Sequence, residues 1–449
     1  MSQSLAKDFN FRSLLKFAFP SIIMMIFMSL YSIVDGFFIA QYVDSMALSA
    51  ANIVYPAVSI LLAVGIMFGT GGSAVVAAKI GQGKQEEANR NFSALTLTTL
   101  IIGILGAVLG NLFCRQICSL LGATPVLMDY GTAYLRTILS FAPVCLLQAL
   151  FQSFFVTAGR PGLGLSLTVS AGITNMLLDY LFVVPLHLGV AGAALATGLG
   201  QCIPAVAGIL YFTFARKGLR FTRPEFSKGL LSTSCFNGSS EMVSNLSAAV
   251  TYLFNMLMLK FEGEIGVAAI TAILYGQFLF VALYLGYSIG VAPVFSFNYG
   301  SRNKQRLIRL YRISIRFVVV SSVIIALVAA FGSPVISAVF MQKGTYGFEL
   351  TRHGGYLFSI AYLFCGTNIV ASGIFTALSD GKTSALISFL RTFVFIVLSA
   401  LLLPLVLGTN GVWLSIPVAE FLTLFISVPK LSRYFKDPKV ATETQTSPN

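Results

Sequence analysis

Two stretches of this chain, AKIGQGKQEEANR at residues 78–90 and FNYGSRNKQRLIR at residues 297–309, share one pattern. Each has a glycine, a short polar turn and the basic start of a helix, and each follows a long apolar segment. Position 78 of the first stretch thus matches position 297 of the second. FFVTAGRPG at 154–162 and IFTALSDGK at 374–382 repeat the relationship at almost the same separation along the chain. Because the offset is maintained, the sequence predicts two copies of one structural unit.

Composition places the chain in a membrane. Of its 449 residues, 56% are hydrophobic and only 10% are charged, and the mean hydropathy is +0.85. A soluble domain carries about 25% charged residues. Apolar runs of about 20 residues, enough to cross a bilayer core as a helix, recur along the chain. We expect an all-α polytopic membrane protein with twelve transmembrane helices, near residues 14–40, 49–78, 91–113, 131–158, 162–185, 189–214, 231–259, 266–296, 306–330, 355–378, 384–405 and 410–430.

The net charge of +13 is explained by membrane orientation rather than by nucleic-acid binding. Most of the 29 Lys and Arg residues precede the first span, follow the last, or lie between an even-numbered span and the next odd-numbered one. Lys382 and Arg391 are assigned to one such junction. Because basic residues collect in cytoplasmic loops, we expect both termini to be cytoplasmic. The five bases placed on the other side are Arg115, Arg136, Lys260, Lys343 and Arg352.

Six spans in each copy is an even number, so both copies enter the membrane from the same side. The copies are then two six-helix bundles related by a pseudo-two-fold axis along the membrane normal. Rocking of such bundles exposes a central site to each side in turn, which indicates a transporter, although channels also contain duplicated halves. We expect an N-terminal lobe over 1–215, a cytoplasmic linker over 216–229, a C-terminal lobe over 230–434 and a cytoplasmic tail over 435–449.

Acidic residues inside the apolar spans are the candidates for function. Asp35 and Asp179 are the clear cases, and Glu241 and Glu420 are weaker ones. A carboxylate at a helix centre costs roughly 3 kcal/mol, so it needs a partner, water, a proton or a cation. Each aspartate follows a cytoplasmic base, Lys16 or Arg160, at the same separation, which places both at roughly 28 Å along their helices.

Two further polar residues fall at the same height. Asn175 lies one helical turn before Asp179 and shares its helix face. Thr197 lies about 12 Å below the start of a descending span. We predict a cation- or proton-coupling site, with Na⁺ as its metal if it binds one; structural hydrogen bonds are the alternative. The residues of this site are Asp35, Asn175, Asp179 and Thr197.

Pro20 precedes Asp35 on the same span and removes one backbone hydrogen bond. We predict a hinge there that responds to the charge of Asp35; a static membrane-helix proline is the alternative. Flexible methionine and flat aromatic side chains suit a site that accepts many shapes, although they are also typical of lipid-facing or core positions. The candidate drug-binding residues are Met24, Met28, Phe37, Glu241 and Asn245.

Four segments resemble the multidrug and toxic compound extrusion (MATE) family: SLYSIVDGFFIAQ at 29–41, GTGGSAVVAAKIGQGK at 69–84, FQSFFVTAGRPG at 151–162 and NMLLDYLFV at 175–183. The resemblance covers nearly the whole chain and is nearest to the MepA-like branch of bacterial multidrug exporters. It implies a V-shaped pair of six-helix lobes in the plasma membrane of a prokaryote. It also implies drug efflux driven by inward movement of H⁺ or Na⁺.

In prokaryotic members similar to DinF, the family's cation site matches the four residues already placed by depth. The resemblance adds a supporting polar network, in which Tyr134 matches a family Tyr and Gln152 stands where an Asn is expected. Sodium-coupled relatives of another branch use acids in the C-terminal lobe, where this chain has Asn368 and no clear mid-helix acid. We therefore favour coupling in the N-terminal lobe, by either H⁺ or Na⁺.

We predict a secondary active multidrug efflux transporter, which antiports cationic or amphipathic organic compounds against H⁺ or Na⁺. The alternative is a flippase for a lipid or a lipid-linked oligosaccharide, whose cavity would need several cationic side chains. An enzyme is disfavoured, because the chain shows no Ser-His-Asp set, no metal-spaced His or Cys and no Walker-type loop. We expect no cofactor, no nucleic-acid partner, surrounding membrane lipid and a monomer.

Overall fold

All regular secondary structure in the described part of this computed structural model is helical. The structure describes residues 5–42, 45–245 and 248–436. Within these ranges it gives no side-chain environment for residues 32–41, 45, 47–48, 245 and 248–249. Three predicted site residues, Asp35, Phe37 and Asn245, therefore have a described backbone, but their side chains lie outside the described part.

The N-terminal lobe consists of helices whose starts follow the glycine and proline punctuation of the sequence. Pro125 and Pro161 occupy the first turn of their helices, where a missing N–H costs no hydrogen bond. In chain order the helices are α2 (Phe11–Tyr42), α3 (Ser45–Gly81), α4 (Gln85–Leu112), α5 (Cys114–Leu120), α6 (Pro125–Ser140), α7 (Ala142–Thr157), α8 (Pro161–Val183) and α9 (Gly189–Phe214).

The C-terminal lobe repeats this order, with one π-helical turn in its fifth pass, which is the eleventh of the chain. That turn, η1, spans Leu390–Val394 and lies between two α-helical parts of the same pass. The other helices are α10 (Leu230–Asn245), α11 (Ala248–Gly300), α12 (Lys304–Phe340), α13 (Tyr346–Ser359), α14 (Tyr362–Ala377), α15 (Gly381–Phe389), α16 (Phe395–Leu407) and α17 (Thr409–Lys436).

Breaks inside the helices account for the number of membrane passes. Nine helices of the described residues are long and apolar enough to cross a bilayer. The pairs α6–α7 and α13–α14, bent by 56° and 50°, each add one broken pass. Gly263 divides α11 into two helices, because its φ of 65° is not helical. When α10 and the first part of α11 are counted as one pass, the described helices provide the twelve passes that the sequence predicts.

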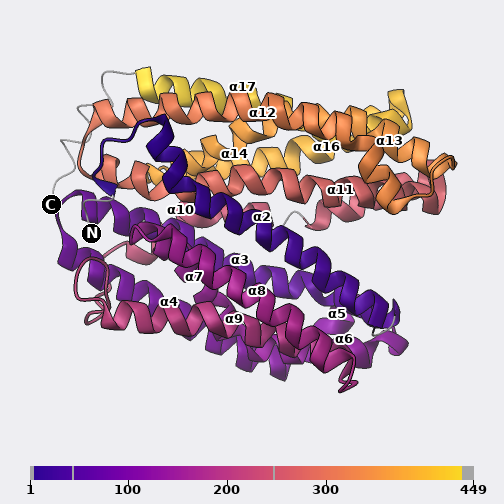
Figure 1. The fold of residues 1–449 in the computed structure, drawn as a ribbon, viewed down its shortest axis with the longest axis horizontal. Coiled ribbons are helices and arrows are strands. Elements are labelled where there is room, and N and C mark those ends of the chain that lie inside the picture. The colour runs from indigo at the N-terminus through magenta and orange to yellow at the C-terminus, as the bar shows by residue number, and fades with distance from the viewer. Residues whose placement is uncertain (1–4, 43–44, 246–247, 437–449) are drawn as a thin grey trace.

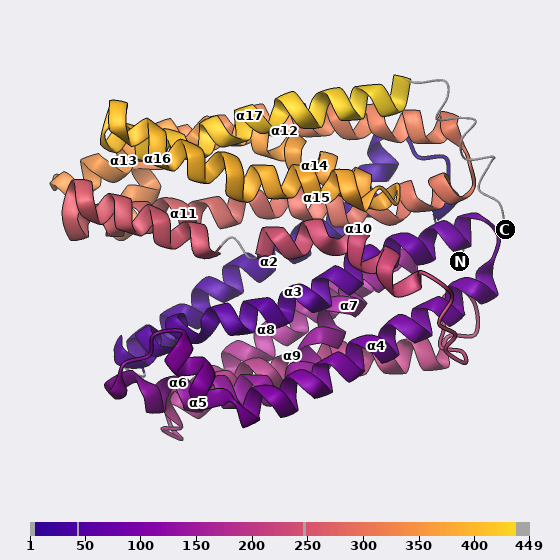
Figure 2. The same ribbon diagram turned by 180° about the vertical axis from the view of Figure 1, so that it is seen from behind.

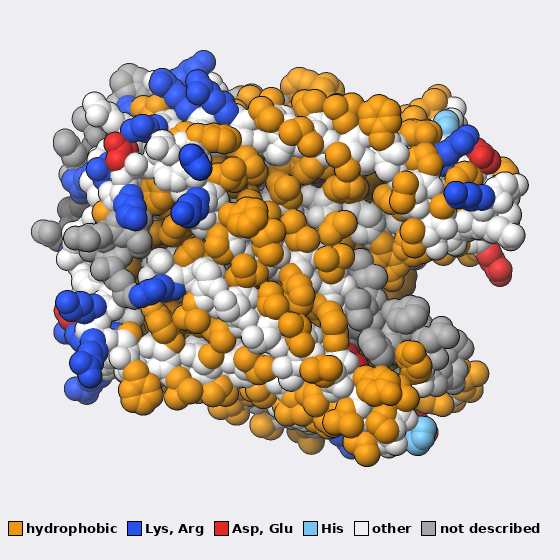
Figure 3. All heavy atoms as spheres, viewed as in Figure 1, with side chains coloured by type: hydrophobic (Ala, Val, Ile, Leu, Met, Phe, Trp, Pro, Cys, Tyr) orange, Lys and Arg blue, Asp and Glu red, His pale blue; other side chains and the backbone are white. Residues whose placement is uncertain are grey.

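The two lobes form a V. Figures 1 and 2 show α2–α9 beside α10–α17, with the start of α2 and the end of α17 at the same end of the molecule. The lobes meet at that end and diverge toward the other. Figure 3 shows Lys and Arg side chains gathered where the lobes meet, and a hollow between the lobes at the opposite end. The predicted pair of six-helix bundles is thus confirmed.

Glycines bring the two lobes into close backbone contact at the basic end. A Cβ placed on Gly81 of α3 would lie 2.0 Å from the carbonyl oxygen of Phe297. A Cβ placed on Gly300 of α11 would lie 2.0 Å from the carbonyl oxygen of Ala78. In the alignment of the two copies, Gly81 matches Gly300 and Ala78 matches Phe297. The duplication therefore builds the same interlobe contact twice.

Two segments also cross between the lobes at the basic end. Before α2, Asp8 pairs with Arg309 of α12 at 3.0 Å. Before α10, Glu225 of the linker pairs with Arg90 of α4 at 2.6 Å. Arg90 and Arg309 are the last residues of the two matched stretches, 78–90 and 297–309. Each lobe is therefore held by the segment that leads into the first helix of the other lobe, and we call these two contacts the cross-lobe clasps.

Candidate functional site: buried polar clusters in both lobes

Asn175 and Asp179 lie one turn apart on α8, and both are buried, with exposed fractions of 3% and 0%. Asn175 donates from Nδ2 to Oγ1 of Thr197 on α9 at 3.3 Å. Thr197 donates its hydroxyl proton to the carbonyl oxygen of Ala193, within its own helix. Oδ1 of Asn175 has no hydrogen-bond partner in the described part of the chain. The structure thus joins Asn175 of α8 to Thr197 of α9, and Asp179 lies buried one turn further along α8.

The fourth residue, Asp35, lies on α2, which packs along α8. The contact is close at Gly172, where an added Cβ would meet Cε1 of Phe27 at 2.5 Å. Asp35 lies about two turns beyond Phe27, and Asp179 lies about two turns beyond Gly172. At 1.5 Å per residue, both backbones lie roughly 11 Å from the same contact. The two aspartates are therefore at one height on neighbouring helices, and the direction of the Asp35 side chain is outside the described part.

The supporting residues inferred from the family resemblance lie in two different places. Gln152 of α7 donates from Nε2 to Sδ of Met28 at 3.0 Å and to Sδ of Met25 at 3.8 Å. It therefore contacts α2 two turns below Asp35. Tyr134 of α6 is partly buried and packs near Ala51, in a separate small cluster. Among the described side chains, no direct hydrogen bond joins Gln152 to Tyr134.

Helix α2 is continuous through Pro20, and the proline lies within the contact between the lobes. A Cβ on Gly290 would meet Cα of Ala18 at 2.9 Å, and one on Gly286 would meet Cα of Ile22 at 2.5 Å. Met24, further along the helix, is buried, whereas Met28 is only partly buried. A bend at Pro20 would therefore move the outer part of α2 relative to a part held by the other lobe.

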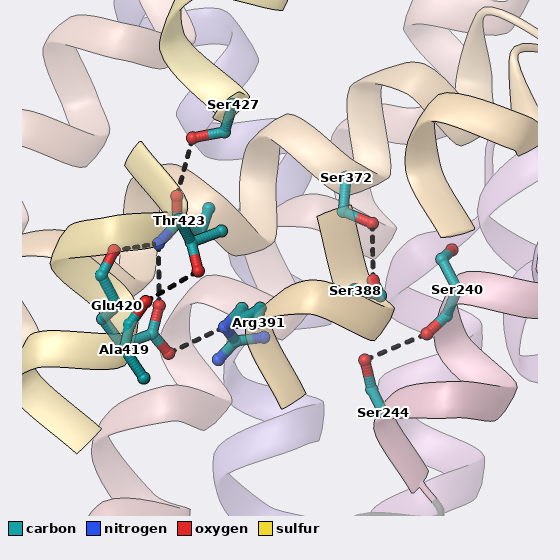
Figure 4. Close-up of polar contacts among 10 residues, drawn as sticks. Ser240, Ser244, Ser372, Ser388, Arg391, Ala419, Glu420, Thr423 and Ser427 are labelled. Carbon is teal, nitrogen blue, oxygen red and sulfur yellow. Dashed lines mark hydrogen bonds and ion pairs between the residues drawn. The ribbon is translucent and has the colours of Figure 1, made fainter. Parts of the chain in front are cut away.

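The C-terminal lobe contains a second buried polar cluster. Arg391 of η1 donates from Nε to Oε1 of Glu420 on α17 at 2.7 Å. Asn368 of α14 donates to Oε2 and to the backbone oxygen of the same glutamate, both at 2.8 Å. Ser427 donates to Oδ1 of Asn368 at 2.7 Å. Figure 4 shows the arginine and the glutamate directed toward each other from separate passes. Both carboxylate oxygens of Glu420 and both side-chain polar atoms of Asn368 therefore have a hydrogen-bond partner.

The sequence-based placement of Arg391 at a cytoplasmic junction is wrong. The residue lies about 15 Å of helix beyond Gly381, the start of its pass. Its side chain is only 15% exposed, and that of Glu420 is 3% exposed. The sequence does contain a signal for this buried position. Arg391 is the only charged residue in the apolar run ISFLRTFVF, whereas a residue at a loop junction would have polar neighbours.

Glu241 of α10 is partly buried and interacts electrostatically with Arg391. Buried hydroxyl groups join α10 to the two passes beside it. Ser240 lies 3.2 Å from Thr376, which lies 2.8 Å from Ser384. Figure 4 places Ser240 on the side of Arg391 away from Glu420. Small hydroxyl residues that bond across helices are typical of tight membrane-helix packing.

A conventional transition-metal centre is not formed by the described residues. No group of three or more His, Cys, Asp or Glu side chains in that part of the chain could hold a metal ion. The six cysteines are free. Oδ1 of Asn175, which has no hydrogen-bond partner among the described residues, is an oxygen ligand of the kind that hard cations prefer.

Comparison with known proteins identifies the family. The MatE family model matches residues 20–181 and again residues 242–401, one segment in each lobe. The match therefore repeats the duplication read from the sequence. It covers more than half of the chain.

Individual relatives agree with the family match. The multidrug export protein MepA of Staphylococcus haemolyticus is 25% identical over 93% of this chain and 92% of its own. MepA of Staphylococcus aureus strain MRSA252 is 24% identical over 92% and 91%. Among solved structures, MATE in the straight conformation has a TM-score of 0.91 at 20% identity, over 98% of this chain and 99% of that one. MATE in the bent conformation has a TM-score of 0.89 at 20% identity, over 99% of both. This chain belongs to the MatE family, whose members are transporters rather than enzymes.

Proposed function

We propose that the protein is a multidrug efflux antiporter, which moves cationic or amphipathic organic compounds against H⁺ or Na⁺. One observation carries the proposal: Asn175 bonds to Thr197 between α8 and α9, and the buried Asp179 lies one turn along α8, the helix that packs beside the one that bears Asp35. The names of the curated relatives, which are multidrug export proteins, support the substrate class. The depth of the cluster supports coupling to an ion, because isolated charge is unfavourable there.

The charge of the two aspartates supplies the driving force in this proposal. When both carboxylates are ionised, two negative charges lie at one height in the membrane, and their repulsion and desolvation are unfavourable. A proton or a Na⁺ ion relieves this cost. Oδ1 of Asn175 offers one more oxygen ligand for a cation. Capture of the ion then favours whichever conformation brings these groups closest together.

Helix α2 would transmit this change to the drug cavity. Its lower part is held against α11 on both sides of Pro20, while its outer part carries Asp35 along α8. Neutralisation of Asp35 would bend the outer part, narrow the N-terminal cavity and release the drug. Two similar solved structures, described as MATE in straight and bent conformations, are consistent with a bending element in this fold. Antiport follows because ion and drug favour different states.

The conformation of the molecule fits one step of that cycle. The hollow opens at the end opposite the gathered Lys and Arg residues. Basic residues mark the cytoplasmic side, so we assign an outward-facing state with both termini in the cytoplasm of a prokaryotic plasma membrane. Glu241 offers negative charge to a cationic drug, and Met28 offers a flexible apolar contact. We expect the working unit to be a monomer surrounded by lipid.

Ethidium transport by the purified protein in lipid vesicles tests the proposal. A pH gradient and a Na⁺ gradient are imposed separately, with the other ion equal on both sides. We expect one gradient to drive ethidium against its own gradient, and protein-free vesicles to show no such movement. Failure of both gradients, together with binding of a pyrophosphate-linked lipid, would replace the antiporter with a flippase.

A further inference from the structure

The buried pair of Arg391 and Glu420 needs a functional explanation. Placing a charged side chain within a membrane pass is energetically costly, and such residues are usually functional. The two side chains come from neighbouring passes, and the arginine stands in a π-helical turn. Such turns are rare and occur often at functional sites. The glutamate also accepts two hydrogen bonds from Asn368. The pair is therefore fixed in place by the surrounding helices.

The two lobes can be compared through the duplication. When the copies are aligned on their two matched pairs of segments, Arg391 corresponds to Gly172 or Ala171 of α8, and Glu420 corresponds to Gln201 or Gly200 of α9. An added Cβ on Gly200 would lie 2.9 Å from the carbonyl oxygen of Ala171, and 3.1 Å from Cβ of Asn175. The arginine–glutamate pair thus occupies the C-terminal counterpart of the α8–α9 contact beside the proposed coupling site.

The two lobes differ in the charged side chains that they carry at these equivalent places. Helices α8 and α9, which hold the N-terminal cluster, contain no Lys or Arg, and the two bases of the neighbouring α2, Arg12 and Lys16, lie near its cytoplasmic start. In the C-terminal lobe, two carboxylates, Glu420 and Glu241, interact with the guanidinium of Arg391. A guanidinium is always charged, and it is attached to the chain. It can neutralise a carboxylate but cannot be exchanged with the solvent.

We propose that Arg391 is the built-in counter-ion of the C-terminal lobe, which permanently takes the role that an exchangeable H⁺ or Na⁺ takes in the N-terminal lobe. This inference rests on the proposed coupling site. It means that only one of two related lobes responds to the ion, although both carry buried carboxylates. The arginine is a positioning residue in this scheme: it holds Glu420 and limits the negative charge that Glu241 presents. Removal of the guanidinium should convert the C-terminal cluster into a cation site.

The test measures the midpoint of thermal unfolding, Tm, of purified protein in NaCl and in choline chloride at equal ionic strength. All variants carry Asp35→Asn and Asp179→Asn, so that the N-terminal cluster has no carboxylate with which to bind a cation. In this background we expect equal Tm in both salts. Adding Arg391→Met should create a Na⁺-specific increase in Tm of about 2 °C or more, because a ligand that binds only the folded state stabilises it.

Matched variants separate a counter-ion from a purely structural side chain. Arg391→Lys keeps the charge and should remain indifferent to Na⁺. Arg391→Met combined with Glu420→Gln should lose the Na⁺ effect, because one carboxylate of the site has gone. Low millimolar guanidinium should reproduce the stabilisation in Arg391→Met alone. Absence of any Na⁺-specific shift in Arg391→Met, or an equal shift in the Glu420→Gln double variant, would overturn the inference.

One comparison does not depend on recovery of an arginine variant. The inference requires that the Tm of the background protein be the same in NaCl and in choline chloride. If NaCl raised that Tm and Glu420→Gln abolished the increase, an exchangeable ion would already be present in the C-terminal lobe. The inference would then fail. Because these measurements read stability without transport, they can fail while antiport stands. Conversely, unchanged drug efflux by the Asp35→Asn and Asp179→Asn variants would remove the antiport proposal without changing the Tm result.

Discussion

Gly71 of α3 lies directly against Gly238 of α10, across the boundary between the two lobes. A Cβ on Gly71 would lie 2.5 Å from the amide nitrogen of Gly238 and 2.0 Å from the carbonyl oxygen of Ser234. A Cβ on Gly238 would lie 2.0 Å from the carbonyl oxygen of Met67. Gly71 lies almost three turns above Gly81 on α3, so the glycine contacts form a seam roughly 15 Å deep. The basic end is closed because no side chain separates these backbones.

Gly71→Ala and Gly238→Ala should therefore keep the basic end from closing. A Cβ so close to a carbonyl oxygen forces the helices apart, and overpacking of this kind costs about 1–3 kcal/mol. We expect efflux in whole cells to fall strongly while the variants still reach the membrane. Gly332→Ala is the matched control, because a Cβ there meets nothing within 4 Å. Equal efflux by Gly238→Ala and Gly332→Ala would show that the seam does not need to close.

The cross-lobe clasps should have to open during transport. They join Asp8 to Arg309 and Glu225 to Arg90, so each pair holds one lobe to the segment that leads into the other lobe. In a cysteine-free background, we would replace both members of one pair by cysteine and bridge them with a short bifunctional methanethiosulfonate. Bridging should abolish ethidium efflux, and reduction should restore it. Each single-cysteine variant is the control, and undiminished efflux by the bridged protein would rule out movement at that clasp.

The linker between the lobes should be protected from proteases by an aromatic contact. Phe221 stacks on Phe92 with ring centroids 5.0 Å apart and planes at 5°, and the N–H of Thr222 donates to Oγ of Ser93 at 2.9 Å. Phe221→Ala removes the stacking and should make trypsin cut the basic linker several-fold faster, because cleavage follows local opening. Phe226→Ala is the control, since that side chain is 54% exposed. Similar cleavage of both variants would contradict a docked linker.

Thr197 should matter for ion coupling more than other threonines of its helix. Its hydroxyl receives a hydrogen bond from Asn175, whereas the hydroxyl of Thr213 bonds, among the described residues, only to the carbonyl oxygen of Ile209 in its own helix. Thr197→Val should leave Asn175 without that acceptor and raise the ion concentration needed for half-maximal transport, by about tenfold for a hydrogen bond of ordinary strength. Thr213→Val should leave it unchanged. An unaltered ion dependence in Thr197→Val would exclude this residue from the coupling site.

The fold was largely predictable because its signals are long and repeated. Twelve apolar runs, the constant offset between the two copies and the distribution of basic residues each depend on many positions, so local errors cancel. The breaks inside passes were not predicted from the sequence. The 56° bend at α6–α7 is followed by Pro143 in the first turn of α7, which is a helix-start signal inside the apolar run that predicts a single pass over 131–158. The π-helical turn around Arg391 lies in an ordinary apolar run that has no such signal.

The two polar clusters differ in how far the sequence could specify them. Asn175 and Asp179 share a face of one helix, and simple counting of residues brings Thr197 to the same height. The pair of Arg391 and Glu420 joins two passes with no local pattern, and the positive-inside rule assigns a basic residue near a junction to the loop. Its partner could be recognised only when the helices were placed side by side.

The most direct test of the central claim is ion-driven ethidium transport in lipid vesicles by Asp35→Asn and Asp179→Asn, compared with the unmodified protein at equal amounts. Each variant keeps the size of its side chain and removes one negative charge. Our account predicts that neither variant couples drug movement to a pH or Na⁺ gradient, while both still bind ethidium. Gradient-driven efflux at the unmodified rate in both variants would show that these carboxylates do not couple the ion to the drug.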